Sequence, residues 1–416
     1  MLGLDRVKTA LEALGHPDAD IPVRVHIGGT NGKGSTAAFV ESLVRHSGKR
    51  TGLFTSPHLS HFCERFTVAG EIVSPAAVVA AAEQVDQIDS NQLTFFEQVT
   101  LIALCLFARA RVEVAVLEVG LGGRLDATNA VWADVAAVTG VALDHQTYLG
   151  DTLAAIAYEK AGIFKAGQRA VIGRAGEPEA VPLLAAHARN AGVSALTIVA
   201  ESTPGAEPVE AEAIGLAGLH QRDNAACALA IIDHLEALGA IAADRHIRRV
   251  GLASTRLPGR LETIASSPRV VVDGAHNPHA AATLRRAIER FSRPRILLVA
   301  VSSSKDLGGI LAPLLAGVTS VIAARCRYAR TLPATDIVSA VRQIAPTMDC
   351  SEASDVPTAI ERACALAGPD GTVIAAGSLF LAGEVRQIVC GDPTDPIRVS
   401  DPMDIGQSAS DPHRST

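Results

Sequence analysis

The chain has 416 residues, two to three times the usual length of one domain, which favours two domains. Hydrophobic residues make up 48% of the sequence and charged residues 19%, proportions that exclude an intrinsically disordered chain. With 37 basic against 44 acidic residues, a net charge of −7 and 3% aromatic residues, the sequence is not typical of a nucleic-acid-binding protein.

The sequence also disfavours a membrane protein. No apolar stretch reaches the roughly 18 to 20 residues that span a bilayer, and the most apolar segment, residues 99–108, is followed by Arg109 and Arg111. Residues 1–10 lack the basic start and apolar run of a signal peptide. Seven cysteines without a CxxC pair fit free thiols better than disulfides or a cysteine zinc site. We therefore expect a soluble cytoplasmic protein.

Short apolar runs alternate with longer helical patterns along the chain. The runs rich in β-branched residues predict strands at 23–27, 112–117, 135–138, 170–172, 270–272, 296–301, 320–323 and 372–375. Helices are predicted between them, among others at 34–46, 94–110, 151–161 and 224–238. This alternation is typical of an α/β fold whose mostly parallel sheet has helices on both faces.

The alternation is interrupted at residues 254–269, and a second strand–helix series follows. We expect an N-terminal P-loop-type domain and a smaller C-terminal Rossmann-like α/β domain. The predicted division is 1–258 for the first domain, 259–268 for a linker, 269–390 for the second domain and 391–416 for a mobile tail.

A glycine-rich turn follows the first predicted strand. It reads Gly28-Gly-Thr-Asn-Gly-Lys-Gly-Ser-Thr36 and leads into a helix, so that successive backbone N–H groups can point at phosphate oxygens. Lys33 would meet the β- and γ-phosphates, and Ser35 or Thr36 would offer a hydroxyl to Mg²⁺. The spacing departs from GxxxxGK[ST], since two residues separate the glycines and Gly34 follows the lysine. We still favour a nucleotide phosphate loop over a plain strand–helix turn.

Polar side chains end the next two strands. Glu118 closes the run 112–117, and Asp144 with His145 follows the strand after it. Ligands of open parallel sheets gather beyond the carboxyl ends of the strands, and Mg²⁺ prefers carboxylate, hydroxyl and water oxygens. We expect Glu118 to hold the metal of Mg-ATP, with His145 as a further ligand. Lys160 lies near the end of a predicted helix, a position that by itself indicates a lysine facing water.

An ordered set of motifs resembles the folylpolyglutamate synthase/dihydrofolate synthase family of Mur-type ligases, from Leu2 to about Arg386. The longest runs from Leu117 to Asn129 (LEVGLGGRLDATN). The others are GTNGKGS at 29–35, SPHL at 56–59, LDH at 143–145, EKAGI at 159–163, LPGRLE at 257–262 and DGAHNP at 273–278.

The resemblance implies an ATP-dependent ligase that activates a carboxylate as an acyl phosphate, which the amine of L-glutamate then attacks. It assigns ATP binding to Thr30, Asn31, Gly32, Lys33, Gly34, Ser35, Asn224, Arg260 and Asp273. It implies two Mg²⁺ sites, one at Ser35, Ser56 and Glu118 and one at Glu118, His145 and a carbamylated Lys160. Lys33, Glu118, His145 and Lys160 are the implied catalytic residues. Closure of the second domain over the site is expected to shield the acyl phosphate from water.

The resemblance also implies residues for the other substrates. His276 and Ser378 match the glutamate side. The pterin or folate side is assigned to Leu2, Gly3, Leu4, Asp5, Arg6, Thr94, Phe95, Phe96, Glu97, Leu125, Asp126 and Ala127. For Phe95 and Phe96, simple helix packing is an equally good explanation.

Several alternatives remain open. The enzyme is expected to glutamylate dihydropteroate and reduced folates, but folylpolyglutamate synthesis alone, or a non-folate Mur-type amide ligase, also fits. A scaffold protein would need the phosphate loop but not Glu118, His145 and Lys160 together. We expect a monomer that binds small-molecule substrates, without a nucleic-acid or membrane partner. The sequence Ser302-Ser-Ser-Lys-Asp306 departs from the family pattern, with no consequence that we can assign.

Overall fold

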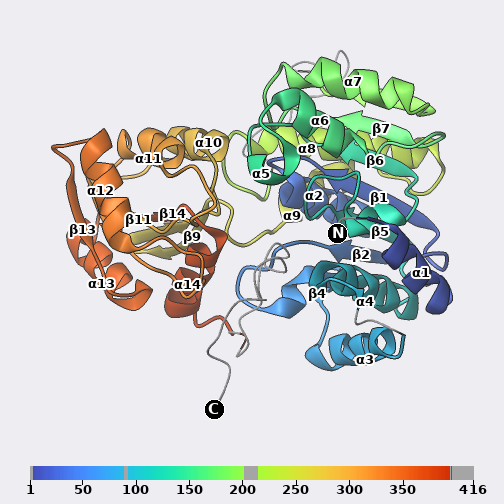
Figure 1. Cartoon of the computed structure of the whole chain (residues 1–416), viewed down its shortest axis with the longest axis horizontal. Helices are drawn as coiled ribbons and strands as arrows, with labels where there is room; N and C mark the ends of the chain where they lie inside the picture. Colours follow the sequence, from blue (N-terminus) through green and yellow to red (C-terminus); the bar gives the residue numbers. More distant parts are fainter. Residues whose placement is uncertain (1–2, 89–91, 201–213, 394, 396–416) are drawn as a thin grey trace.

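Two sheets lie side by side in the computed structural model, which describes residues 3–88, 92–200, 214–393 and 395 (Figure 1). The eight-stranded sheet has the order β4-β3-β2-β5-β1-β6-β7-β8, and the six-stranded sheet has the order β13-β12-β11-β14-β10-β9. We call β1–β8 with α1–α9 the first lobe, and β9–β14 with α10–α14 the second lobe. The predicted α/β class, with a large mostly parallel sheet and a smaller second one, is confirmed.

The first sheet is parallel except at one edge, where β3 and β4 run antiparallel. Its strands are β1 (Val23–Gly28), β2 (Thr51–Phe54), β3 (Phe66–Val68), β4 (Glu71–Ile72), β5 (Val114–Glu118), β6 (Val135–Val138), β7 (Arg169–Ile172) and β8 (Ala195–Ile198). Its helices are α1 (Asp5–Ala13), α2 (Lys33–His46), α3 (Pro75–Asp86), α4 (Phe95–Arg109), α5 (Gln146–Leu149), α6 (Leu153–Ala161), α7 (Ala180–Asn190), α8 (Gln221–Ala237) and α9 (Arg245–Ser254).

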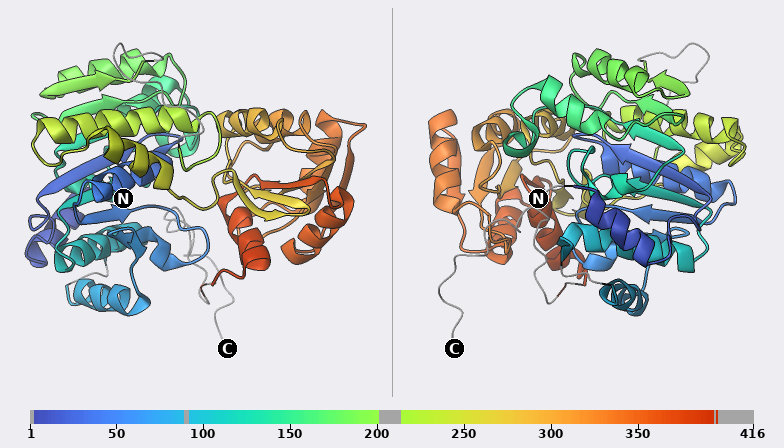
Figure 2. Two further views of the ribbon diagram at one scale, coloured as in Figure 1. Left: turned by 180° about the vertical axis from the view of Figure 1, so that it is seen from behind. Right: turned by 45° about the vertical axis from the view of Figure 1, so that its right-hand side comes forward.

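Both faces of the first sheet are covered, which explains the continuous apolar runs of its strands. In β5, Val114 and Val116 pack in the core under α2, α8 and α9, which Figure 2 shows from behind. Ala115 and Leu117 point the other way, into the core beneath α1, α3 and α4. A third core joins β6 and β7 to α6 and α7. Successive residues of one strand therefore anchor opposite layers.

The second lobe repeats this arrangement on a smaller sheet. Its strands are β9 (Glu262–Ser266), β10 (Arg269–Val272), β11 (Arg295–Val299), β12 (Ser320–Ala323), β13 (Asp349–Glu352) and β14 (Thr372–Ala376). Its helices are α10 (Pro278–Ile288), α11 (Leu307–Leu315), α12 (Ala334–Ile344), α13 (Val356–Ala367) and α14 (Leu379–Cys390). Helices α10, α11 and α12 cover one face, and α13 and α14 cover the other.

The structure contains six strands that the sequence-based expectation did not include. The interval expected to be a linker contains β9, which pairs antiparallel with β10. Strands β2, β3, β4, β8 and β13 were not predicted either. Strands β3 and β4 have only three and two residues, and β13 reads Asp-Cys-Ser-Glu at an edge of its sheet. Leu2 and most of the expected tail at 391–416 lie outside the described residues. Among the residues that are described, no helix combines the length and apolar character needed to cross a bilayer.

Candidate active site

Three neighbouring strands of the first sheet bring the predicted site residues together. Strand β1 pairs with β5 on one side and β6 on the other, so their carboxyl ends lie at one edge. A cavity of about 860 Å³ opens there and is lined by both lobes. The predicted residues that line it are Thr30, Asn31, Gly32, Lys33, Gly34, Ser35, Ser56, Glu118, His145, Lys160, Asn224, Arg260, Asp273 and His276.

The phosphate loop requires glycine at two positions. Gly29 has φ +143°, and a Cβ there would lie 2.0 Å from Oγ1 of Thr139. Gly32 has φ +81°, and its Cβ would lie 2.2 Å from Oδ1 of Asn224. Gly32 is also the N-cap of α2 and no side chain caps that helix, so the first-turn N–H groups face the cavity. This is the arrangement that binds an anion at a helix N-terminus.

Two lysines converge on one carbonyl of this loop. Nζ of Lys33 donates to the carbonyl oxygens of Gly29 (3.1 Å) and Thr30 (3.2 Å). Nζ of Lys160 donates to the same Gly29 oxygen at 2.9 Å, and Lys160 is only 4% exposed. The expectation from helix position, a lysine in water, is therefore wrong. Burial, with Lys33 adding to it, lowers the pKa of Lys160 to about 7.

Glu118 lies against the first turn of α2. It is 4% exposed, and its Oε2 accepts the backbone N–H of Ser56 at 3.1 Å. A Cβ on Gly34 would lie 3.5 Å from the same oxygen. Burial raises the pKa of Glu118, and Lys33 opposes that rise. With the hydroxyls of Ser35 and Ser56, this carboxylate forms an oxygen donor set of the kind that Mg²⁺ prefers beside phosphates.

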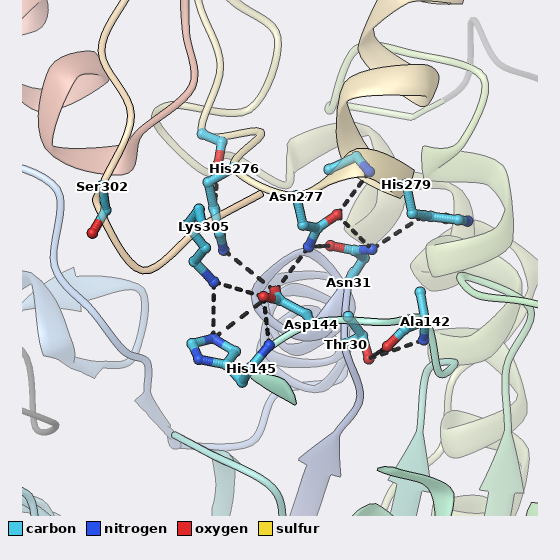
Figure 3. A network of polar contacts seen from close by, with 12 residues as sticks. Thr30, Asn31, Ala142, Asp144, His145, His276, Asn277, His279, Ser302 and Lys305 are labelled. Atoms are coloured by element: carbon cyan, nitrogen blue, oxygen red, sulfur yellow. Dashed lines mark hydrogen bonds and ion pairs between the residues drawn. The ribbon is translucent and has the colours of Figure 1, made fainter. Parts of the chain in front are cut away.

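The segment between β6 and α5 contacts the second lobe (Figure 3). Oδ1 of Asp144 accepts Nζ of Lys305 at 2.7 Å, and that Nζ lies 3.2 Å from Nε2 of His145. Burial, opposed by Asp144 and assisted by Lys305 and His276, lowers the pKa of His145 to about 3. Burial alone would raise the pKa of Asp144, but the facing His276, Lys305 and His145 hold it well below its usual range. The imidazole of His145, with its pKa lowered to about 3, is neutral near pH 7.

The remaining ATP-side residues come from both lobes. Asn224 on α8 is 2% exposed, and its Oδ1, which has no hydrogen-bond partner within the described parts of the chain, points toward Gly32. Asp273 accepts the N–H groups of Leu261 and Ala275, both at 2.8 Å, and so shapes the turn after β10. An orphaned acceptor beside a phosphate loop fits a ligand N–H donor.

The two glutamate-side residues differ in their surroundings. His276 lines the cavity, and its Nδ1 donates to the carbonyl of Gly274 at 2.7 Å. Ser378 is the N-cap of α14, where its Oγ accepts the N–H of Phe380 at 3.1 Å. Ser378 is a described residue that does not line the cavity.

The residues expected around the pterin form a group beside the cavity. Arg6 of α1 forms an ion pair with Glu97 at 2.8 Å, and Glu97 in turn caps α4 together with Thr94. Phe96 is 7% exposed and packs 6.0 Å from the ring of Phe54, whereas Phe95 is half-buried. Helix α1 begins at Asp5, directly after Gly3 and Leu4. The short η3 helix (Ala127–Ala130) begins at Ala127, directly after Leu125 and Asp126, and is in contact with α1 and α4.

This group joins the cavity wall at one point. Oδ2 of Asp126 accepts the N–H of Leu121 at 2.9 Å, and Oδ1 accepts the hydroxyl of Thr128 at 2.5 Å. A Cβ on Gly120 would lie 2.5 Å from the ring of Phe96. Because Gly120 and Leu121 line the cavity, Phe96 and Asp126 lie directly behind its wall.

Sequence reasoning missed the partners of the predicted residues. Lys305 and Asn277 do not line the cavity, but they bind Asp144 and Asn31, which do. Asp144 is the central residue of the LDH motif at 143–145, to which the sequence assigned no separate role. Lys305 lies in the segment 302–306, which departs from the family pattern. Contacts over 133 and 161 residues have no signal in a single sequence.

Both lobes match family models of known domains. Residues 27–232 match the Mur ligase middle domain, and residues 259–379 match the Mur ligase glutamate ligase domain. The chain is 35% identical to the dihydrofolate synthase/folylpolyglutamate synthase of Escherichia coli, covering 93% of this chain and 91% of that protein. It is 37% identical, over 92% of its length, to a probable bifunctional folylpolyglutamate synthase/dihydropteroate synthase of Halobacterium salinarum, of which it spans about half (49%).

Solved structures extend the likeness to the fold. E. coli FolC in complex with DHPP and ADP superposes with a TM-score of 0.84 at 33% identity, covering 94% of each chain. A bifunctional folylpolyglutamate synthase/dihydrofolate synthase with Mn, AMPPNP and L-glutamate bound superposes with a TM-score of 0.83 at 32% identity, covering 94% of this chain and 95% of that one.

Proposed function

The chain belongs to the dihydrofolate synthase/folylpolyglutamate synthase family of Mur ligases, and we propose that it joins L-glutamate to dihydropteroate and to the glutamate of reduced folates at the expense of ATP. The observation that supports this most directly is the convergence of a phosphate loop, a buried carboxylate and second-lobe polar groups on one cavity. A monomeric enzyme is part of this proposal.

The phosphate loop is the proposed site of the ATP phosphates. The N–H groups at the start of α2 and the ammonium of Lys33 would neutralise the transferring phosphoryl group, since phosphoryl transfer depends mainly on positioning and charge. Lys33 bonds to its own loop carbonyls, so it is held within reach of a phosphate. Arg260 and Asp273 would complete the nucleotide contacts from the second lobe.

Ser35, Ser56 and Glu118 would hold one divalent cation together with phosphate oxygens, because their donor atoms suit Mg²⁺. Such an ion, when bound, supplies a positive charge that lowers the cost of charge developing on the phosphates. A second ion at Glu118, His145 and Lys160 requires two changes in these side chains. Lys160 must become a carbamate, which its low pKa favours because the neutral amine reacts with CO₂. Lys305 must leave Nε2 of His145.

His276 and Ser378 are proposed for the glutamate side, and Arg6, Glu97, Phe96 and Asp126 for the pterin or folate side. The partly buried Arg6–Glu97 pair supports a substrate wall built from α1 and α4. Residues 259–268 are the proposed boundary between the nucleotide and glutamate halves. A polyglutamylase without dihydropteroate activity, or a Mur-type amide ligase for another carboxylate, is the remaining alternative.

ADP release in the presence of Mg-ATP and L-glutamate tests the proposal. Parallel reactions contain 7,8-dihydropteroate or a reduced folylmonoglutamate. Turnover with both acceptors is the expected result, and turnover with the folate alone would restrict the enzyme to polyglutamylation. ATP binding without turnover of either acceptor would contradict the proposed function.

A further inference from the structure

Asp144 is one of the residues through which the loops at the strand ends of the first lobe contact the second lobe (Figure 3). Its Oδ1 accepts Nζ of Lys305 at 2.7 Å, and its Oδ2 accepts Nδ2 of Asn277 at 3.0 Å. Nε2 of His276 lies 3.9 Å from the same Oδ2. The Asp144 side chain is 8% exposed and that of Lys305 is 11% exposed, so water does not screen the pair as it would at the surface.

Asn277 connects this carboxylate to the phosphate loop. Its Nδ2 donates both to Asp144 and to Oδ1 of Asn31, the latter at 3.0 Å. Its Oδ1 accepts the N–H of Ala280 at 2.9 Å and thereby caps α10. Asn277 is 1% exposed. One amide therefore fixes the start of a second-lobe helix, a residue of the phosphate loop and the Asp144 carboxylate at once.

The residues held by these bonds are cavity residues. Asn31, Asp144 and His276 line the cavity, whereas Lys305 and Asn277 do not. Lys305 and Asn277 therefore support the cavity through the residues that they hold. An ion pair between two lobes that a nucleotide must contact simultaneously contributes to affinity by fixing their separation beforehand.

We propose that Asp144, Lys305 and Asn277 form an interlobe latch that positions the second lobe on the phosphate loop and so prepares the nucleotide site. Asp144 is the first-lobe member, and Lys305 and Asn277 are positioning residues from the loops after β11 and β10. The effect of the latch on nucleotide affinity rests on the proposed function, because it requires the nucleotide site proposed above. Its effect on the separation of the two lobes does not depend on that site.

A double-mutant cycle on nucleotide affinity tests the latch. Calorimetry with AMPPNP is applied to the full chain carrying Asp144→Asn, Lys305→Met, both substitutions, or neither. Each single variant is expected to bind about tenfold more weakly, and the double variant also about tenfold, because the second change removes a bond already lost. Lys305→Arg should retain affinity within about threefold, since its guanidinium can still pair with the carboxylate.

Lys49→Met is the matched control, because Lys49 forms an ion pair of 2.9 Å with Glu113 within the first lobe, at residues that do not line the cavity. It should leave nucleotide affinity unchanged. Small-angle scattering without nucleotide gives an independent measurement, in which the latch variants should have a larger radius of gyration than the wild type and Lys49→Met. The latch would be overturned if the single variants bound AMPPNP with wild-type affinity. It would also be overturned if the losses of affinity multiplied in the double variant, or if Lys305→Arg bound as weakly as Lys305→Met. Identical scattering profiles would overturn it too.

The two proposals fail in different ways. A wild-type protein that binds AMPPNP but turns over neither acceptor contradicts the proposed function and leaves the cycle interpretable. A wild-type protein that turns over acceptors while the cycle is multiplicative contradicts the latch alone.

Discussion

The ammonium of Lys160 donates a hydrogen bond to the carbonyl oxygen of Gly29, 131 residues away in the sequence. This contact places a lysine of α6 directly beneath the phosphate loop. The two segments lie far apart in the sequence. Because they are in contact, protonation or carbamylation of Lys160 would change the charge next to the proposed phosphate site.

Replacing Lys160 by alanine is expected to reduce turnover about 100-fold or more, because the proposed carbamate would be a metal ligand. Added short-chain carboxylates should restore part of the activity by supplying the missing anion. Lys165→Met is the control, since Lys165 also donates to backbone carbonyls, those of Asn129 and Val131, but outside the cavity. Unimpaired turnover of Lys160→Ala would exclude the carbamate.

Glu118→Gln is expected to weaken Mn²⁺ binding in the presence of AMPPNP about 100-fold, because the variant loses the charge of the proposed metal ligand. The amide oxygen can still accept the N–H of Ser56, so the fold should be retained. Electron paramagnetic resonance of free Mn²⁺ measures the affinity. Glu113→Gln, at the surface of the same strand region, should bind Mn²⁺ like the wild type. Equal affinity of the two variants would remove Glu118 from the metal site.

Gly32→Ala should weaken nucleotide binding more than tenfold, because the new Cβ meets Oδ1 of Asn224 at 2.2 Å and must displace the loop. Gly48→Ala provides the comparison, since Gly48 also has a positive φ (+90°) but nothing lies within 4 Å of its Cβ. Both variants should lose about 1 kcal/mol of unfolding free energy from the left-handed backbone. Only the first should change AMPPNP affinity in calorimetry.

Acid should destabilise the protein partly through His26. This histidine is 1% exposed, its Nε2 lies 2.6 Å from Oγ1 of Thr128, and burial lowers its pKa from 6.5 to about 3. Between those two values the unfolded chain binds a proton that the folded chain does not. The unfolding free energy should therefore fall as the pH falls, by about 1.4 kcal/mol per pH unit from this group.

Denaturant titrations between pH 7 and pH 4 measure that slope. In His26→Gln, whose side chain does not titrate, the decline should be shallower by the contribution of one group. An unchanged slope would mean that His26 titrates alike in both states.

Glu97→Gln should raise the KM for dihydropteroate more than the KM for ATP, since it weakens the ion pair with Arg6 at the proposed pterin side while Thr94 can still cap α4. The expected change is about tenfold for the pterin and less than twofold for ATP, as for the loss of a partly buried charge-assisted hydrogen bond. Steady-state kinetics with each substrate varied in turn decides this. A change confined to ATP would reassign Glu97.

Buried strands with continuous apolar runs could be predicted from the sequence, as β5 and β6 show, because burial on both faces leaves one unmistakable pattern. Strand β13 could not, since an edge strand of polar residues is defined by its pairing with β12. The same limit applies to the site. The turn at 28–36 indicates phosphate binding by its own composition, whereas the burial of Lys160 and the pairing of Lys305 with Asp144 arise from contacts between distant segments.

Synthesis of the chain proceeds in a different order from the assembly of its site. The phosphate loop is complete at residue 35, but its strand pairs with β5 and β6, and Asn277 and Lys305 follow much later. At about 5 to 20 residues per second, tens of seconds separate the loop from the last of these groups. A nascent first lobe that still lacks Asn277 and Lys305 is therefore expected to bind ATP more weakly than the two-lobe chain.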